Sequence, residues 1–254
     1  MCAPAGGTRV TLIRDGVGSA TVPDSASHVF VRYLDLSNFS SVKKFATEVM
    51  KEWATVDVLI YNAGIVGQKT HETTVDGNEV SFQTNHLSHI LLTNLLLPAI
   101  QRSTVSRASY LSFLITRPPA VSTTHHSFPL PPPPLSHITT TTVCPGFVIT
   151  GLGVAQDAAG IASMREKEGA TPGHDGVYSS VFAACSVEAG FAAGGGGEVE
   201  EKKGEGKGKG EWRTYDTYAV RQELHPVAAD EEVGRRLWEE SRRLCGKYGE
   251  EVRL

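Results

Sequence analysis

Hydrophobic and polar residues follow a strand, helix, strand order in the first part of the chain. The segments RVTLIRD (9–15) and HVFVRYLDL (28–36) are rich in β-branched and apolar residues and are bounded by Gly, Pro, Asp and Ser, so each predicts a strand. Residues 37–53 have the spacing of an amphipathic helix, with Ser37 as a candidate N-cap. Its apolar positions are Val42, Phe45, Ala46, Val49, Met50 and Trp53. The apolar run VDVLIYNAG (56–64) predicts a parallel strand covered on both faces.

The same alternation continues to the end of the chain. A long helix is predicted over residues 75–100, stopped near Pro98. Strands are predicted over 106–116 and 139–144, and a helix over 175–186. The segment from 230 to 248 predicts a final helix, whose inner face consists of Val233, Leu237, Ser241 and Leu244. This order indicates an α/β fold with a doubly wound parallel sheet.

Two segments interrupt the pattern. Residues 117–137 include four consecutive prolines at 131–134, which forbid an α-helix and favour polyproline II, so we expect an irregular insertion. Residues 190–211 consist mainly of Gly, Glu and Lys and have almost nothing to bury, which predicts a surface insertion. We expect no nucleic-acid role for these lysines, because the glutamates offset their charge.

Composition narrows the classes of function. A chain of 254 residues with 40% hydrophobic residues fits one domain over residues 1–254. The net charge of -4 provides no general attraction to nucleic acid or to an acidic membrane. Four widely spaced cysteines fit reduced thiols in the cytoplasm, and neither they nor the histidines predict a metal site. The longest apolar run is shorter than the ~20 residues of a membrane span, so we expect no transmembrane segment.

Several segments resemble one known family. They are LDLSNFSSVKKFA, VDVLIYNAGI, NHLSHILLTNLLLP, CPGFVITGL and RRLWEESRRL. In this order they are similar to the short-chain dehydrogenase/reductases, specifically the retinol-dehydrogenase-like branch. The resemblance implies a Rossmann-like sheet and NADP- or NAD-dependent oxidoreduction of a small carbonyl or alcohol substrate.

The resemblance also implies roles for residues near three predicted elements. Asp35 would contact the adenine ring, although a carboxylate at the start of a helix beside Ser37 explains it equally well. Asn62, Ala63 and Gly64 would line the cofactor cleft, and their alternative is a simple turn after a strand. Asn85 would be the catalytic Asn that holds a water in a proton relay; alternatively, its amide is satisfied within a helix kink.

Further cofactor contacts are implied at two other places. Pro145, Gly146 and Thr150 match the Pro-Gly-x-x-x-Thr pattern that flanks the nicotinamide, although a strand-ending turn also explains Pro-Gly. Arg14 would bind the 2′-phosphate of NADP if residues 9–14 form the second strand of the family.

The sequence departs from the family first at the cofactor phosphates. The family holds the pyrophosphate with a Gly-rich turn between its first strand and helix, and only Gly16-Val17-Gly18 resembles part of that turn. The sheet is therefore expected to be incomplete at its first strand, which normally lies at the centre. The strands that flank this position would expose unpaired edges unless they pair directly.

The second departure affects catalysis. The family's Tyr-x-x-x-Lys pair lies on a helix between the fifth and sixth strands, where the ammonium lowers the pKa of the phenol. No tyrosine of this chain has a lysine four residues later, and residues 117–137 occupy the place of the helix. The family's catalytic serine aligns with Phe113, and Ser112 lies one position before it.

We therefore expect an oxidoreductase of this family with impaired catalysis. One alternative is a non-catalytic pseudo-dehydrogenase that binds partners or forms a homodimer through the 75–100 helix. Another is a faulty gene model with no function, in which residues 117–137 are non-coding sequence read through.

Overall fold

The structure, a computed structural model, describes the strands and helices that surround the candidate site. It covers residues 9–14, 28–65, 72–103, 107–111, 138–145, 148–149, 171–172, 175–186, 213–215, 230–246 and 248. The predictions for residues 16–18, Ser112, Phe113, 117–137, Gly146, Thr150 and 190–211 lie outside the described residues.

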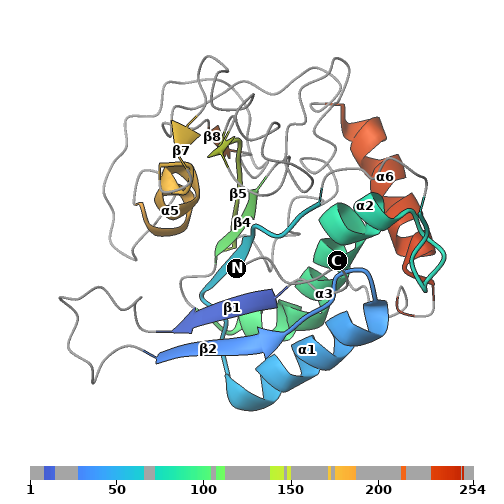
Figure 1. Ribbon diagram of the computed structural model, residues 1–254, viewed down its shortest axis with the longest axis horizontal. Helices are drawn as coiled ribbons and strands as arrows, with labels where there is room; N and C mark the ends of the chain where they lie inside the picture. The colour runs from blue at the N-terminus through green and yellow to red at the C-terminus, as the bar shows by residue number, and fades with distance from the viewer. Residues whose placement is uncertain are drawn as a thin grey trace.

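A four-stranded parallel sheet carries the site (Figure 1). Its strands, in spatial order, are β3 (Val58–Tyr61), β4 (Arg107–Leu111), β5 (Thr139–Val143) and β8 (Arg213–Tyr215). Each neighbouring pair is parallel, as the alternation of strands and helices predicts. Two short strands, β6 (Val148–Ile149) and β7 (Thr171–Pro172), form a separate parallel pair.

The first two strands depart from the prediction of a single parallel sheet. β1 (Arg9–Arg14) and β2 (His28–Tyr33) pair with each other, antiparallel, in a sheet of their own. Direct pairing gives the backbone N–H and C=O groups of both strands partners, which an extended segment needs. The prediction of a parallel arrangement is therefore wrong for these strands, although both lie where the sequence pattern predicts them.

Helix α1 (Phe39–Glu52) forms where the apolar periodicity predicts it. Its N-cap is Asn38 rather than Ser37: the Asn38 side chain accepts from the backbone N–H groups of Ser40 and Ser41. The helix buries the side chains of Phe39, Val42, Phe45, Ala46 and Val49. They join residues of the next long helix in the main hydrophobic core.

The second long helix is built in three parts. It consists of α2 (Val80–Phe82), the π-helical turn η1 (Gln83–Leu87) and α3 (Ser88–Gln101). It begins after the N-cap Glu79 and not at residue 75, because Thr73 and Glu79 bridge a turn in which Gly77 has a φ of 85°. Pro98 does not stop it but lies inside α3, three residues before its end.

Helices cover both faces of the parallel sheet, as a doubly wound fold requires. Leu59 and Tyr61 of β3 belong to the core formed with α1 and α3. Thr142 is in register with Tyr61 through β4, so these two residues share one face of the sheet. Val143 follows Thr142 in the strand and therefore lies on the opposite face. There Val143 packs against Ala183 of α5 (Tyr178–Cys185).

β3 itself is not covered on both faces. Val58 and Ile60 alternate with the buried Leu59 and Tyr61, and they remain 40% and 45% exposed. The prediction of coverage on both faces is therefore wrong for this strand. The exposure arises because β3 is an edge strand of its sheet and α5 packs mainly over β4 and β5. A continuous apolar run in the sequence does not distinguish such an edge strand from one that is covered on both faces.

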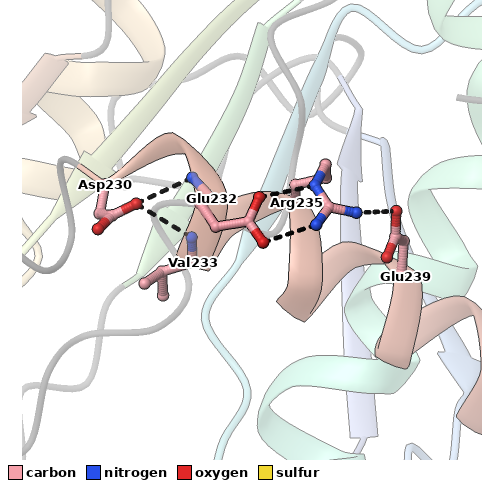
Figure 2. A network of polar contacts seen from close by, with 5 residues as sticks. All are labelled: Asp230, Glu232, Val233, Arg235 and Glu239. Atoms are coloured by element: carbon pink, nitrogen blue, oxygen red, sulfur yellow. Dashed lines mark hydrogen bonds and ion pairs between the residues drawn. The ribbon is translucent and has the colours of Figure 1, made fainter.

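The last helix, α6 (Glu231–Leu244), packs with a slightly different face from the one predicted. Gly234, Trp238 and Ser241 are buried, whereas Val233 and Leu237 are only half-buried. The outer face is charged: Asp230 caps the helix, and Arg235 pairs with Glu232 and Glu239 (Figure 2). No helix in the described part of the chain is both long and apolar enough to cross a bilayer.

Candidate functional site at the carboxyl edge of the sheet

The carboxyl ends of the parallel strands bring several predicted site residues to one edge. Asn62, Ala63 and Gly64 follow β3, and Pro145 comes two residues after the end of β5. The two strands are in register through β4, so both segments leave the sheet at the same edge. Asn62 is exposed, Ala63 and Gly64 are half-buried, and Pro145 is buried. This is the edge at which open α/β sheets bind ligands.

Asn85 fixes the segment that follows β3. Its side-chain oxygen accepts from the backbone N–H of Ile65 at 2.8 Å, and its side-chain nitrogen donates to the backbone oxygen of Ile65 at 2.8 Å. The alternative in which the amide is satisfied within its own helix kink is therefore wrong. The amide instead joins the long helix to the end of the Asn62–Ile65 segment, and it is itself half-buried.

Asn85 lies at the centre of the π-helical turn η1. Such turns place one additional residue in a helical turn and occur frequently at functional sites. The ring of His89, one turn further along the chain, makes a hydrogen bond to the backbone of Asn85. Both the side chain and the backbone of Asn85 thus have partners.

Asp35 occupies the position of a carboxylate at the start of a helix. Its Oδ1 accepts from the backbone N–H of Ser37 at 2.9 Å and from the Ser37 hydroxyl at 2.6 Å. Its own N–H donates to the Ser41 hydroxyl at 3.0 Å. These bonds support the structural alternative for Asp35, and the adenine contact stays a prediction.

Arg14 lies far from Asp35. In the antiparallel pair, Arg14 is opposite His28, whereas Arg9 is opposite Tyr33, two residues before Asp35. At about 3.3 Å per residue, the backbones of Arg14 and Asp35 are about 20 Å apart. The structure therefore does not bring together the residues predicted for the adenine and for the 2′-phosphate.

The structure adds polar residues that the sequence did not single out. Gln83 accepts from Thr74 at 2.6 Å and from Asn78 at 2.9 Å, and it donates to Asp76 at 2.7 Å. Asp76 also accepts from the N–H of Phe39 at the start of α1, at 2.8 Å. The available signal was a run of four consecutive polar residues, 83–86, within a helix rich in apolar residues.

His86 and His89 are the strongly perturbed titratable groups of this region. Burial, followed by repulsion from His89, lowers the pKa of His86 to about 3. Burial lowers the pKa of His89 to about 4, despite its hydrogen bond to the backbone of Asn85. Both imidazoles are therefore neutral near neutral pH.

The fold and this edge define an α/β protein with a candidate site at the carboxyl ends of parallel strands. The sequence profile described as short chain dehydrogenase matches residues 14–108. The chain thus resembles the short-chain dehydrogenase/reductase family and, among its members, the retinol dehydrogenases.

Individual relatives show how far the similarity extends. Human retinol dehydrogenase 13 is 47% identical over 87 residues, which cover 34% of this chain and 26% of that protein. Mouse retinol dehydrogenase 14 is 29% identical over 259 residues, covering 90% of this chain and 71% of that protein. The match to the human relative thus spans about a quarter of its length.

Solved structures also align with this chain. Ligand-free aldohexose dehydrogenase from Thermoplasma acidophilum is 20% identical, with a TM-score of 0.49 over 75% of this chain and 78% of that one. NADPH-bound carbonyl reductase from chicken fatty liver is 15% identical, with a TM-score of 0.45 over 74% of this chain and 75% of that one.

Proposed function

We propose that this chain binds NADP or NAD at the carboxyl edge of its parallel sheet, as an oxidoreductase of the short-chain type. The observation that carries the proposal is the pair of hydrogen bonds between Asn85 and Ile65. They hold Asn62, Ala63 and Gly64 at the end of β3, where the family resemblance leads us to expect the cofactor. The substrate class that the resemblance suggests is a small carbonyl compound or alcohol.

The residues at this edge fit a nicotinamide dinucleotide in part. The exposed Asn62 and the half-buried Gly64 offer polar and backbone groups at the sheet edge. The buried Pro145 lies at the same edge, after β5, which is separated from β3 by β4. The cofactor, when bound, supplies the hydride chemistry. The residues of this chain contribute orientation, and Asn85 would hold the Asn62–Ile65 segment in the binding conformation.

We further propose that catalysis is impaired. Proton transfer to or from the substrate oxygen needs a positioned acid or base, and none of the seven tyrosines is followed four residues later by lysine. Loss of such a group costs about 10²- to 10⁴-fold in rate. The protein would then bind the cofactor but turn over carbonyl substrates slowly.

A titration of the full-length protein with NADPH, followed by nicotinamide fluorescence, tests both parts. We expect saturable binding that weakens in N85A, with turnover of short aldehydes and ketones below about 1% of that of active family members. The control variant S40A changes a helix residue outside this edge and should bind NADPH normally. Absence of binding would contradict the cofactor proposal, and turnover equal to that of relatives would contradict impaired catalysis.

Partner binding through the 75–100 helix is the alternative function. The structure gives it little support, because almost every residue of α3 is buried within this chain. Among the residues of α3, Pro98 and Gln101 are the exposed ones. Size-exclusion chromatography with light scattering tests it: a monomer at micromolar concentration would exclude a stable homodimer.

A further inference from the structure

The C-terminal helix contacts the turn that carries Asn85. Ser241 of α6 is fully buried, and its hydroxyl lies 2.9 Å from Nε2 of His86, the residue after Asn85. The same hydroxyl donates to the backbone oxygen of Leu237 at 2.7 Å. Because the Ser241 hydrogen is used in that bond, His86 Nε2 is the donor and Ser241 the acceptor.

This contact is one of several that hold the π-helical turn from different directions. Gln83, at its first residue, is bound by Thr74, Asp76 and Asn78. Ser88, directly after the turn, donates to the backbone oxygen of Leu36 at 2.5 Å. His86 also stacks on Phe82, with ring centroids 4.9 Å apart.

A π-helical turn is less favourable than a regular α-helical one, so tertiary contacts must maintain it. No glycine or proline occurs within residues 83–87 to impose it locally. The side chains of Gln83 and His86 are both buried and bonded, which fixes the backbone on either side of Asn85. The direction of the Asn85 side chain toward Ile65 depends on that backbone.

We propose that Ser241 is a positioning residue for the site, acting through His86 on the bond between Asn85 and Ile65. Ser241 is the buried hydroxyl of this helix, because the other positions described as buried in α6, Gly234 and Trp238, do not carry one. The C-terminal helix thereby controls the order of the Asn62–Ile65 segment. The inference rests on the proposed function only for its effect on NADPH binding. Its effect on the order of the Asn62–Ile65 segment can be measured without the cofactor.

Hydrogen exchange at the Ile65 amide, which donates to Asn85, reports this coupling directly. We expect S241A to speed exchange at Ile65 by about 2- to 10-fold, the effect of losing one hydrogen bond. The matched variant is S40A, which removes a 2.7 Å bond between the Ser40 and Tyr248 hydroxyls. That bond also joins the C-terminal segment to the rest of the protein, but it does not involve the π-helical turn.

Comparing S241A with S40A distinguishes a specific effect on the Asn85–Ile65 bond from a general loss of stability. Faster exchange at Ile65 in S241A but not in S40A supports the proposal, and so does a non-additive effect of S241A and H86F in a double-mutant cycle. Equal acceleration in S241A and S40A, or no change in S241A, would overturn it. If S241A does not fold, H86F replaces it, since phenylalanine keeps the stack on Phe82 and removes the donor.

NADPH binding by the same variants separates this inference from the proposed function. If the wild-type protein binds NADPH, S241A should weaken binding several-fold while S40A does not. If the wild-type protein does not bind NADPH, the proposed function fails, and the exchange rates at Ile65 still decide whether Ser241 positions Asn85.

Discussion

Acidification should destabilise this protein through His86 and His89. Both imidazoles are buried and neutral, with pKa values lowered to about 3 and about 4. In the unfolded chain each has a pKa of about 6.5. The unfolded state therefore binds more protons than the folded state below about pH 6.5, and stability falls as the pH decreases through that value.

The magnitude follows from the two pKa differences. At about pH 5, each unfolded imidazole is almost fully protonated while each folded one is almost neutral, which costs about 2 kcal/mol per histidine. The two together remove about 4 kcal/mol relative to pH 8, a large part of the roughly 5 to 15 kcal/mol that stabilises a typical domain. Above about pH 7 neither histidine contributes to the pH dependence.

Urea denaturation at several pH values between about 5 and 8 measures this effect, with circular dichroism as the signal. H86F lacks one of the two groups, so its free energy of unfolding should depend on pH about half as strongly as that of the wild type. A free energy of unfolding that changes by less than about 1 kcal/mol over this range would refute the burial of neutral histidines. An unchanged pH dependence in H86F would refute the role of His86 alone.

Substitutions at three further positions test other parts of the structure by the same denaturation assay. N85A removes two hydrogen bonds to Ile65 and should cost about 1 to 3 kcal/mol, whereas N85Q, if it can reach Ile65, should cost less. G77A should cost about 1 kcal/mol, because Gly77 has a φ of 85° and its surroundings have space for a methyl group; a neutral effect would contradict that backbone conformation. L91A removes a fully buried side chain of α3 and should cost about 2 to 5 kcal/mol, and a loss below about 1 kcal/mol would contradict its burial.

Local patterns predict most of the elements, because period and propensity act over short distances. The apolar spacing of Val42, Phe45 and Val49 predicts α1, and all three side chains are buried. The long helix ends at Gln101, one residue beyond its predicted end at residue 100. Pro98 lies inside the helix, because proline lacks only one hydrogen bond and the buried Ala99 and Ile100 continue the packing past it.

Strand pairing depends on contacts that no local pattern contains. The composition of residues 28–33 predicts a strand correctly, yet it cannot tell whether β2 joins the parallel sheet or pairs with β1. The alternation of strands and helices and the family resemblance both favoured the parallel sheet, whereas β1 and β2 pair with each other in antiparallel orientation. The same limit applies to Arg14, whose distance from Asp35 follows from the antiparallel register.

For the candidate site, the sequence predicts individual residues better than it predicts the hydrogen bonds between them. Asn85 and the segment 62–64 were expected from resemblance, and the structure brings them together through Ile65. The bonds that support Asn85 come from residues remote in sequence, such as Ser241, which is 155 positions from His86. Helical periodicity indicated that Ser241 faces inward, but periodicity does not identify the partner of a buried hydroxyl.

The supports of the π-helical turn come from segments outside the two breaks in the family pattern. Among the described residues they are Leu36, Ile65, the 74–78 turn and Ser241. None of these lies within residues 117–137 or 190–211, the two segments that break the family pattern. A change in either segment should therefore leave these described contacts of the turn in place. We expect hydrogen exchange at the Ile65 amide to stay the same after such a change, even where the rate of turnover changes.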